Sequence, residues 1–128
     1  MRGLKVVLFI NALLFTLYGL VDLFIPDQLV KAGMGQDAAS ARHVAAIILG
    51  LSFVLWAAIR DPARYAAVID GLILLNGIDL LVGLFQSVSG IESWANTTVG
   101  MVLNVALGVG LVIFRPRTAA KPGTALPP

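Results

Sequence analysis

An aspartate in the middle of a long apolar stretch is the residue of this chain with the clearest chemical potential. Asp79 lies in AAVIDGLILLNGIDLLVGLF, residues 66–85, which contain no Lys, Arg or His. A helix of this length can cross the hydrocarbon core of a bilayer, about 30 Å thick. Because a charged group in hydrocarbon costs at least about 2.5 kcal/mol, Asp79 must face protein, water or the membrane interface.

Three further polar side chains fall at about the depth of Asp79. Depth is counted at 1.5 Å per helical residue from the basic end of each apolar run, and it comes to roughly 16 to 22 Å for this group. The expected intramembrane polar cluster is Asp79, Asn76, Tyr18 and Asn104. One interpretation is a structural network in which each hydrogen bond between helices contributes about 0.6 to 2 kcal/mol. The other is a carboxyl group at Asp79 that gains and loses a proton.

Two polar residues lie nearer the inner boundary, at a depth of about 9 Å. Asn11 and Asp70 form a candidate inner polar pair, or Asp70 reaches the interface alone. Nine residues separate Asp70 from Asp79, and at 100° per residue this places them on opposite faces of one helix. We therefore expect the two aspartates to serve separate sites.

A candidate outer mouth is marked by Asp22, Arg42 and His43. There Asp22 reaches water or pairs with Arg42. His43 is the one histidine of the chain, and no second histidine or carboxylate stands four residues away to share a metal ion. Since the chain also has no cysteine, we expect no metal site and no cofactor.

Small residues recur along the last apolar run. Gly100, Asn104 and Gly108 are spaced four residues apart, a small-xxx-small pattern that lets membrane helices approach closely. Gly83 shares a helix face with Asn76 and Asp79. The glycines expected to support helix packing are Gly100, Gly108 and Gly83.

The composition places the whole chain in the membrane class. Of its 128 residues, 59% are hydrophobic and 12% charged, against about 45–50% and 25% in soluble domains. The expected fold is an all-α integral membrane four-helix bundle over residues 1–115, with a disordered, Pro-rich basic tail at 116–128. Its expected spans are about 4–25, 41–60, 63–86 and 97–114. Asp61 followed by Pro62 predicts the start of the third span, as N-cap and first helical residue.

Basic residues at the span ends predict the orientation. Seven lie on one side, namely Arg2, Lys5, Arg60, Arg64, Arg115, Arg117 and Lys121, and two on the other, Lys31 and Arg42. The excess of positive charge marks the cytoplasmic side, so we expect an up-down-up-down order with both termini cytoplasmic. A net charge of +2 spread over several loops forms no groove for nucleic acid.

Three short motifs carry a resemblance to a known group. With Tyr18-Gly19-Leu20, Phe24-Ile25-Pro26 and Arg60-Asp61-Pro62, the chain resembles the small four-helix bacterial membrane proteins called DoxX-like and BphX-like. The likeness covers the four-span layout, roughly residues 4–114. It implies a four-span bacterial membrane protein, and some DoxX-type members are regarded as subunits of quinone-linked oxidoreductases. The Ala- and Gly-rich composition suits the bacterial inner membrane.

Nucleotide-binding and hydrolase motifs such as the P-loop, GxGxxG, HExxH and GxSxG are missing from the chain. The sequence therefore favours a non-enzymatic accessory or scaffolding subunit of a membrane complex, or a self-associating bundle. Its expected partners are the lipid bilayer and other membrane subunits or a second copy. The alternative is a small proton-coupled transporter that uses Asp79, and a third role, as a quinone-linked oxidoreductase subunit, follows from the resemblance alone.

Overall fold

The computed structural model describes residues 2–26 and 38–117 and consists of four long α-helices. They are α1 (Arg2–Phe24), α3 (Ala38–Arg60), α4 (Ala66–Val88) and α5 (Trp94–Phe114). Each helix is long and apolar enough to cross a membrane. The expected all-α fold with four candidate spans is therefore confirmed. The tail at 118–128 and Lys31 lie outside the described residues.

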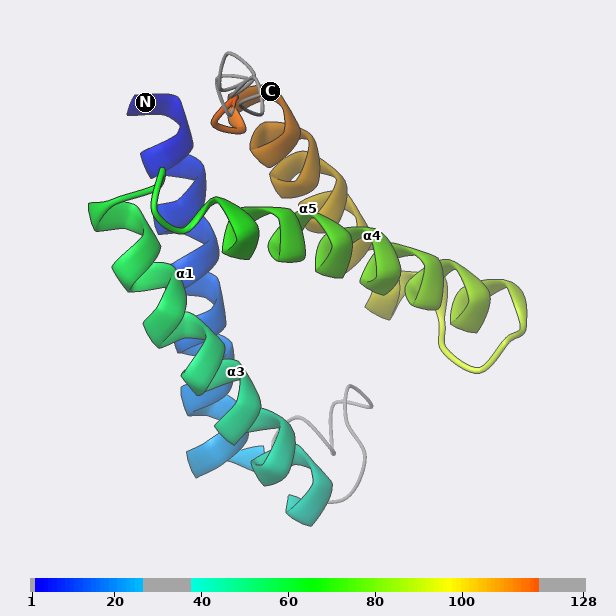
Figure 1. Cartoon of the computed structure of the whole chain (residues 1–128). Helices are drawn as coiled ribbons and strands as arrows, with labels where there is room; N and C mark the ends of the chain where they lie inside the picture. Colours follow the sequence, from blue (N-terminus) through cyan, green and yellow to red (C-terminus); the bar gives the residue numbers. More distant parts are fainter. Residues whose placement is uncertain (1, 27–37, 118–128) are drawn as a thin grey trace, which may run out of the picture.

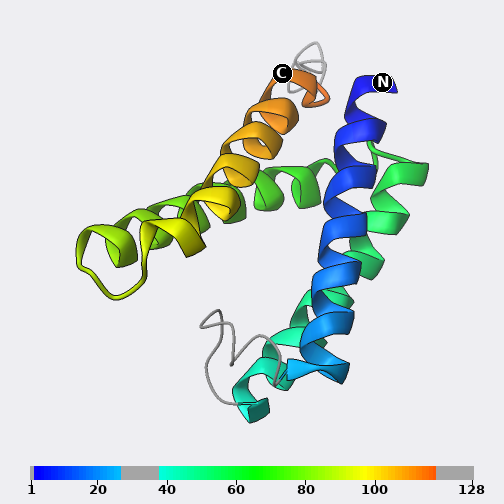
Figure 2. The same ribbon diagram turned by 180° about the vertical axis from the view of Figure 1, so that it is seen from behind.

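The helices pack in two pairs, α1 with α3 and α4 with α5 (Figures 1 and 2). In the first pair the indole of Trp56 packs edge-on against Phe9, with ring centroids 5.4 Å apart, and its N–H donates to Thr16 Oγ1 at 3.0 Å. In the second pair the hydroxyl groups of Ser87 and Thr97 are hydrogen-bonded at 2.5 Å. Because lipid tails are as apolar as the hydrophobic side chains of the helices, close packing and such hydrogen bonds hold the pairs together.

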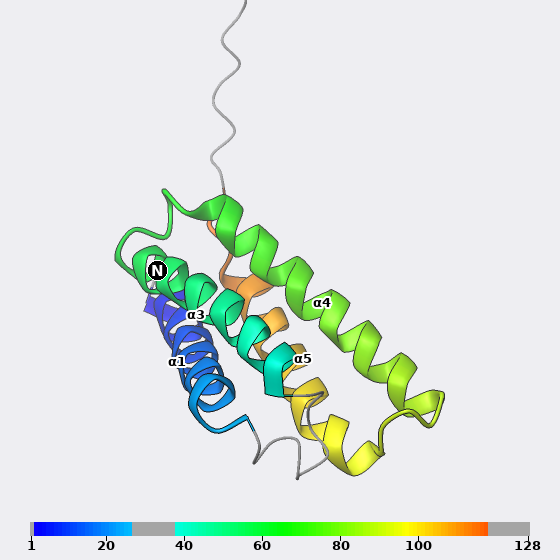
Figure 3. The same cartoon turned by 90° about the horizontal axis from the view of Figure 1, so that it is seen from below.

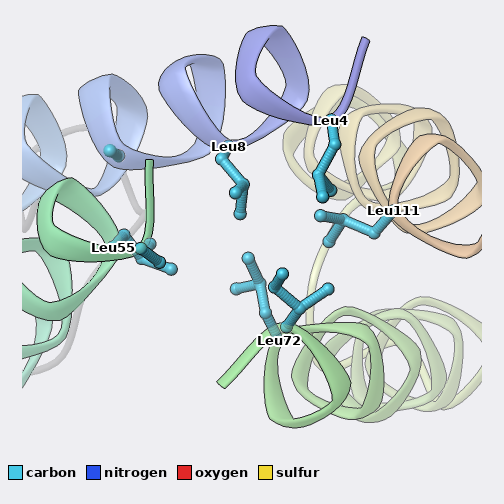
Figure 4. Packing of buried hydrophobic residues seen from close by; sticks show 8 residues of the cluster. Leu4, Leu8, Leu55, Leu72 and Leu111 are labelled. Atoms are coloured by element: carbon cyan, nitrogen blue, oxygen red, sulfur yellow. The ribbon is translucent and has the colours of Figure 1, made fainter. Parts of the chain in front are cut away.

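The two pairs meet at one end of the molecule. A cluster of buried side chains fills this junction: Leu4, Leu8, Ala12, Leu55, Ala58, Ile69, Leu72 and Leu111. Figure 4 shows Leu4 and Leu8 of α1 facing Leu72 of α4 and Leu111 of α5. At the same end Gly3 lies against the ring of Phe114, which leaves no room there for a Cβ atom. The first turn of α1 is thus held beside the last turn of α5.

Away from this junction the pairs diverge. Helix α4 runs outward from the α1–α3 pair at a wide angle (Figure 1). The connection between α4 and α5 lies at the far end of the second pair (Figures 1 and 3). Only 11% to 28% of the most apolar part of each helix is buried within the chain. Most of the helical surface is consequently left for lipid or for another protein.

Two short connections set the ends of α4. Residues 62–65 form a turn of their own, so the helix expected from residue 63 begins at Ala66. At the other end Gly90 takes a left-handed φ of 71°, which favours glycine. Its N–H donates to Ser87 O at 3.3 Å and that of Ile91 to Gln86 O at 2.9 Å, the two bonds of a Schellman motif. This motif turns the chain from α4 into α5.

Candidate functional site

A polar cavity opens beside the α4–α5 pair, at the side where α1 supplies one wall. Its volume is about 470 Å³. The polar side chains that line it are Tyr18, Asp79, Gln86, Glu92, Asn96, Thr97 and Asn104, and the other lining residues are Val82, Gly83, Val99, Gly100, Met101 and Leu103. A space of this size can take a small ligand or side chains of another protein.

The central contact in the cavity joins α4 to α5. The side-chain amide of Asn104 donates to Asp79 Oδ2 at 2.6 Å. Asp79 Oδ1 has no hydrogen-bond partner among the described residues, and the Asp79 side chain is exposed within the chain. The cavity therefore holds one carboxyl oxygen that is fixed by an amide and one that is open to a further donor.

Tyr18, which belongs to the other helix pair, lines the same cavity as this carboxyl group. Tyr18 is 48% exposed, and Glu92 lines the same cavity. Three residues of the expected polar cluster, Tyr18, Asp79 and Asn104, thus line one cavity.

Asn76 lies apart from that cavity although it belongs to the same expected cluster. It is buried, and its amide donates to Leu72 O of its own helix at 2.8 Å. The Asn76 Cβ atom lies beside Gly108: a Cβ atom added to Gly108 would be 3.6 Å from it. Asn76 and Asn104 also line a second, apolar groove of about 310 Å³ on the α4–α5 pair. Asn76 therefore supports the contact between these helices.

The candidate inner pair, Asn11 and Asp70, is not joined by a hydrogen bond. Asp70 instead forms an ion pair with Arg115, which follows α5, and accepts a hydrogen bond from its Nη2. Asn11 is fully buried in α1 and donates to Val7 O at 2.9 Å, while its Oδ1 has no partner among the described residues. Asp70 and Asp79 serve separate contacts, as their spacing on one helix suggests.

The candidate outer mouth is spread over two environments. The side chain of Asp22 is buried near the end of α1, whereas Arg42 and His43 are exposed on the first turns of α3. Among the residues that the structure describes, Asp22 forms no ion pair with Arg42. The ion pair found among residues 2–26 and 38–117 joins Asp70 and Arg115 instead.

The three glycines singled out in the sequence have different surroundings. A Cβ on Gly83 would lie 3.2 Å from Met101, and Gly108 lies against Asn76, so both support the approach of α4 and α5. Gly100 has open space around it and lines the cavity. Close contacts also form at Gly19, against Leu49, and at Gly110, against Val7. The spacing of glycines did not distinguish these positions from the open ones.

Four polar cavity residues were not expected from the sequence: Gln86, Glu92, Asn96 and Thr97. They stand at the end of α4, in the connection and at the start of α5, where polar residues are ordinary. The Schellman motif brings them together, because it places Glu92 beside Gln86 with a bond from Glu92 N–H to Gln86 O at 3.2 Å. The glycine at position 90 was the one local signal of this turn.

The chemistry available in the cavity is carboxylate and amide hydrogen bonding. Among the described residues, no three acidic or histidine side chains converge in a way that could hold a metal ion. No protein-family model, no curated protein and no solved structure matches this chain.

Proposed function

We propose that this chain is an inner-membrane protein with four spans in up-down-up-down order and both termini cytoplasmic. Its proposed role is non-enzymatic, as an accessory or scaffolding subunit of a membrane complex or as a self-associating bundle. The charge bias of seven basic residues to two supports the orientation. The contact of Gly3 with Phe114 supports it too, because it brings the start of α1 next to the end of α5. Membership of the DoxX-like and BphX-like group is part of this proposal.

The polar cavity is the observation that carries the proposed role. A polar group exposed to hydrocarbon costs free energy unless another polar group or water meets it. The chain leaves the second oxygen of Asp79 and the side chain of Asn96 open there, because the helix pairs diverge and do not cover them. A second protein surface that closes this opening would satisfy these groups. The cavity is therefore the proposed contact with the partner.

Substitutions at Asp79 test this role in the purified complex. Asp79→Asn keeps the shape and a hydrogen-bonding oxygen, so we expect association to survive, whereas Asp79→Leu removes the polar contact and weakens it. The measurement is the mass of the protein complex released from mild detergent, by native mass spectrometry. A wild-type chain that is monomeric in membranes as well as in detergent would contradict the proposal.

A second candidate function is proton-coupled transport through Asp79. It is favoured by one feature, the open carboxyl oxygen in a cavity that extends from the α4–α5 connection into the middle of α4. In this case Asp79→Asn would fold and associate normally but could not ionise, so proton flux into liposomes that contain the protein would stop. Equal flux for wild-type and Asp79→Asn protein would eliminate this candidate.

A further inference from the structure

The charge of the cavity is one-sided. Asp79 and Glu92 line it. None of the lining residues, as far as the structure describes the chain, is Lys, Arg or His. Because a cavity between membrane helices has low-dielectric walls, the field of these carboxyl groups is poorly screened and favours a positive ligand.

The two carboxyl groups stand at different levels of the cavity. Asp79 lies 13 residues after the start of α4, about 20 Å along the helix, and Glu92 belongs to the connection after α4. Between them the wall is formed by the first turns of α5 with Asn96 and Gly100. A cation that enters past Glu92 would meet the open oxygen of Asp79 farther in.

Part of the remaining lining is apolar or aromatic. Val82, Val99 and Met101 offer side chains for an apolar body, and a half-exposed Tyr18 ring offers a face for a positive group. At Gly100 no side chain fills the cavity, and beyond the adjacent residues and backbone of its own helix no atom of the described chain lies within 4 Å of the position that a Cβ would take. Ligand sites of about 300 to 1,000 Å³ with a few polar groups in an apolar lining are typical for small molecules, and this cavity of about 470 Å³ falls in that range.

We infer that the cavity binds a small organic cation, an ammonium group carried on an apolar body. The ammonium group lies between Tyr18 and the open oxygen of Asp79, with the Asn104 amide holding the other oxygen in place. Since Tyr18 belongs to α1 and Asp79 to α4, the bound cation links the two helix pairs and stabilises the folded chain. The cation and the proposed partner would occupy the same cavity, so they would compete for it. The inference does not require the accessory role, because cation binding is measured on the chain alone and partner contact is measured in membranes.

The test uses benzyltrimethylammonium as the probe and the full chain in a non-ionic detergent. Binding is measured by isothermal titration calorimetry, with benzenesulfonate as an anion of similar size. We expect the wild-type chain to bind the cation and to give no heat of binding with the anion. Asp79→Asn should weaken cation binding at least about ten-fold, since it removes the facing charge, while Asp79→Glu retains most of it.

The matched control is Asp70→Asn, the same change on the same helix at a carboxyl group outside the cavity. It should leave the dissociation constant for the probe unchanged within about two-fold. Glu92→Gln removes the carboxyl charge that lines the cavity from the α4–α5 connection, outside both helices. It should weaken binding by a smaller factor than Asp79→Asn. No binding to wild-type protein at millimolar probe would overturn the inference. So would equal binding of the probe by wild-type and Asp79→Asn protein, or equal binding of the anion.

Discussion

Arg115 and Asp70 form a bidentate ion pair. Nε lies 2.7 Å from Asp70 Oδ1, and Nη2 donates to Asp70 Oδ2 at 2.7 Å. The pair joins the residue after α5 to the second turn of α4, next to the buried junction of the four helices. It explains how a carboxyl group in a long apolar stretch is accommodated, because the long arginine side chain carries a positive charge to it.

The first prediction concerns the strength of this ion pair. The Arg115 and Asp70 side chains are 57% and 43% exposed, and exposed pairs contribute about 0.2 to 1 kcal/mol. Asp70→Asn should therefore lower the free energy of unfolding by no more than about 1 kcal/mol, and added salt should reduce the difference. Unfolding in detergent at two salt concentrations measures both effects, with Arg117→Gln as the control for loss of a nearby charge. A salt-independent loss above about 3 kcal/mol would contradict this account of the pair.

The second prediction concerns the contact between α1 and α3. A Cβ on Gly19 would lie 2.8 Å from Leu49 Cγ, so Gly19→Ala should force the helices apart and cost about 1 to 3 kcal/mol. Gly50→Ala is the matched control on α3, since a Cβ there meets nothing within 4 Å, and it should be neutral or stabilising. Thermal unfolding of the two variants compares them directly. The contact is refuted if both variants unfold at the wild-type temperature.

The third prediction concerns the turn between α3 and α4. Asp61 Oδ1 accepts the N–H of Arg64 at 3.2 Å, and this bond caps the turn at 62–65 and not α4 itself. Asp61→Ala should cost about 0.5 to 1 kcal/mol, near the lower end for a lost cap, because the bond is exposed. Asp61→Asn keeps the accepting oxygen and should cost less. Equal losses for the two variants in detergent unfolding would show that charge, and not capping, is what matters at this position.

The fourth prediction concerns orientation in the membrane. An even number of candidate spans and the excess of positive charge on one side predict that both termini lie in the cytoplasm. A reporter fused after Pro128 should be active only as a cytoplasmic reporter, and one inserted between α4 and α5, after Gly90, only as a periplasmic one. A periplasmic readout at Pro128 would contradict the proposed order of spans.

The four helices could be predicted from the sequence because their cause is local. Each apolar run is long enough to form a helix that satisfies its own backbone in lipid, and Pro26 and Pro116 follow the ends of α1 and α5. The separation of Asp70 from Asp79 likewise follows from helical geometry alone. The contact between Asp79 and Asn104 could be predicted by counting the depth of each residue along its helix, since both lie near the middle of their helices.

The shape of the cavity could not be predicted, because it depends on contacts between distant helices. The angle between the pairs is set by close approaches such as Gly3 with Phe114 and Gly110 with Val7, which no periodicity marks. Asn76 shows the same limit: three residues before Asp79, it is turned by about 60° around the helix and faces Gly108 instead of the cavity. Glu92 belongs to the site because the turn after α4 places it there, and the geometry of that turn depends on Gly90.

The central claim is that a partner closes the polar cavity between the helix pairs, and site-directed crosslinking in native membranes tests it. The chain has no cysteine, so a single cysteine can carry a benzophenone crosslinker at one chosen position. Val99→Cys places it in the cavity, and Phe53→Cys, at a side chain that is 77% exposed on α3, is the control. We predict a discrete crosslinked protein band, to a second copy or to another membrane protein, from position 99 and not from position 53. No band from position 99, or the same bands from both positions, would contradict the claim.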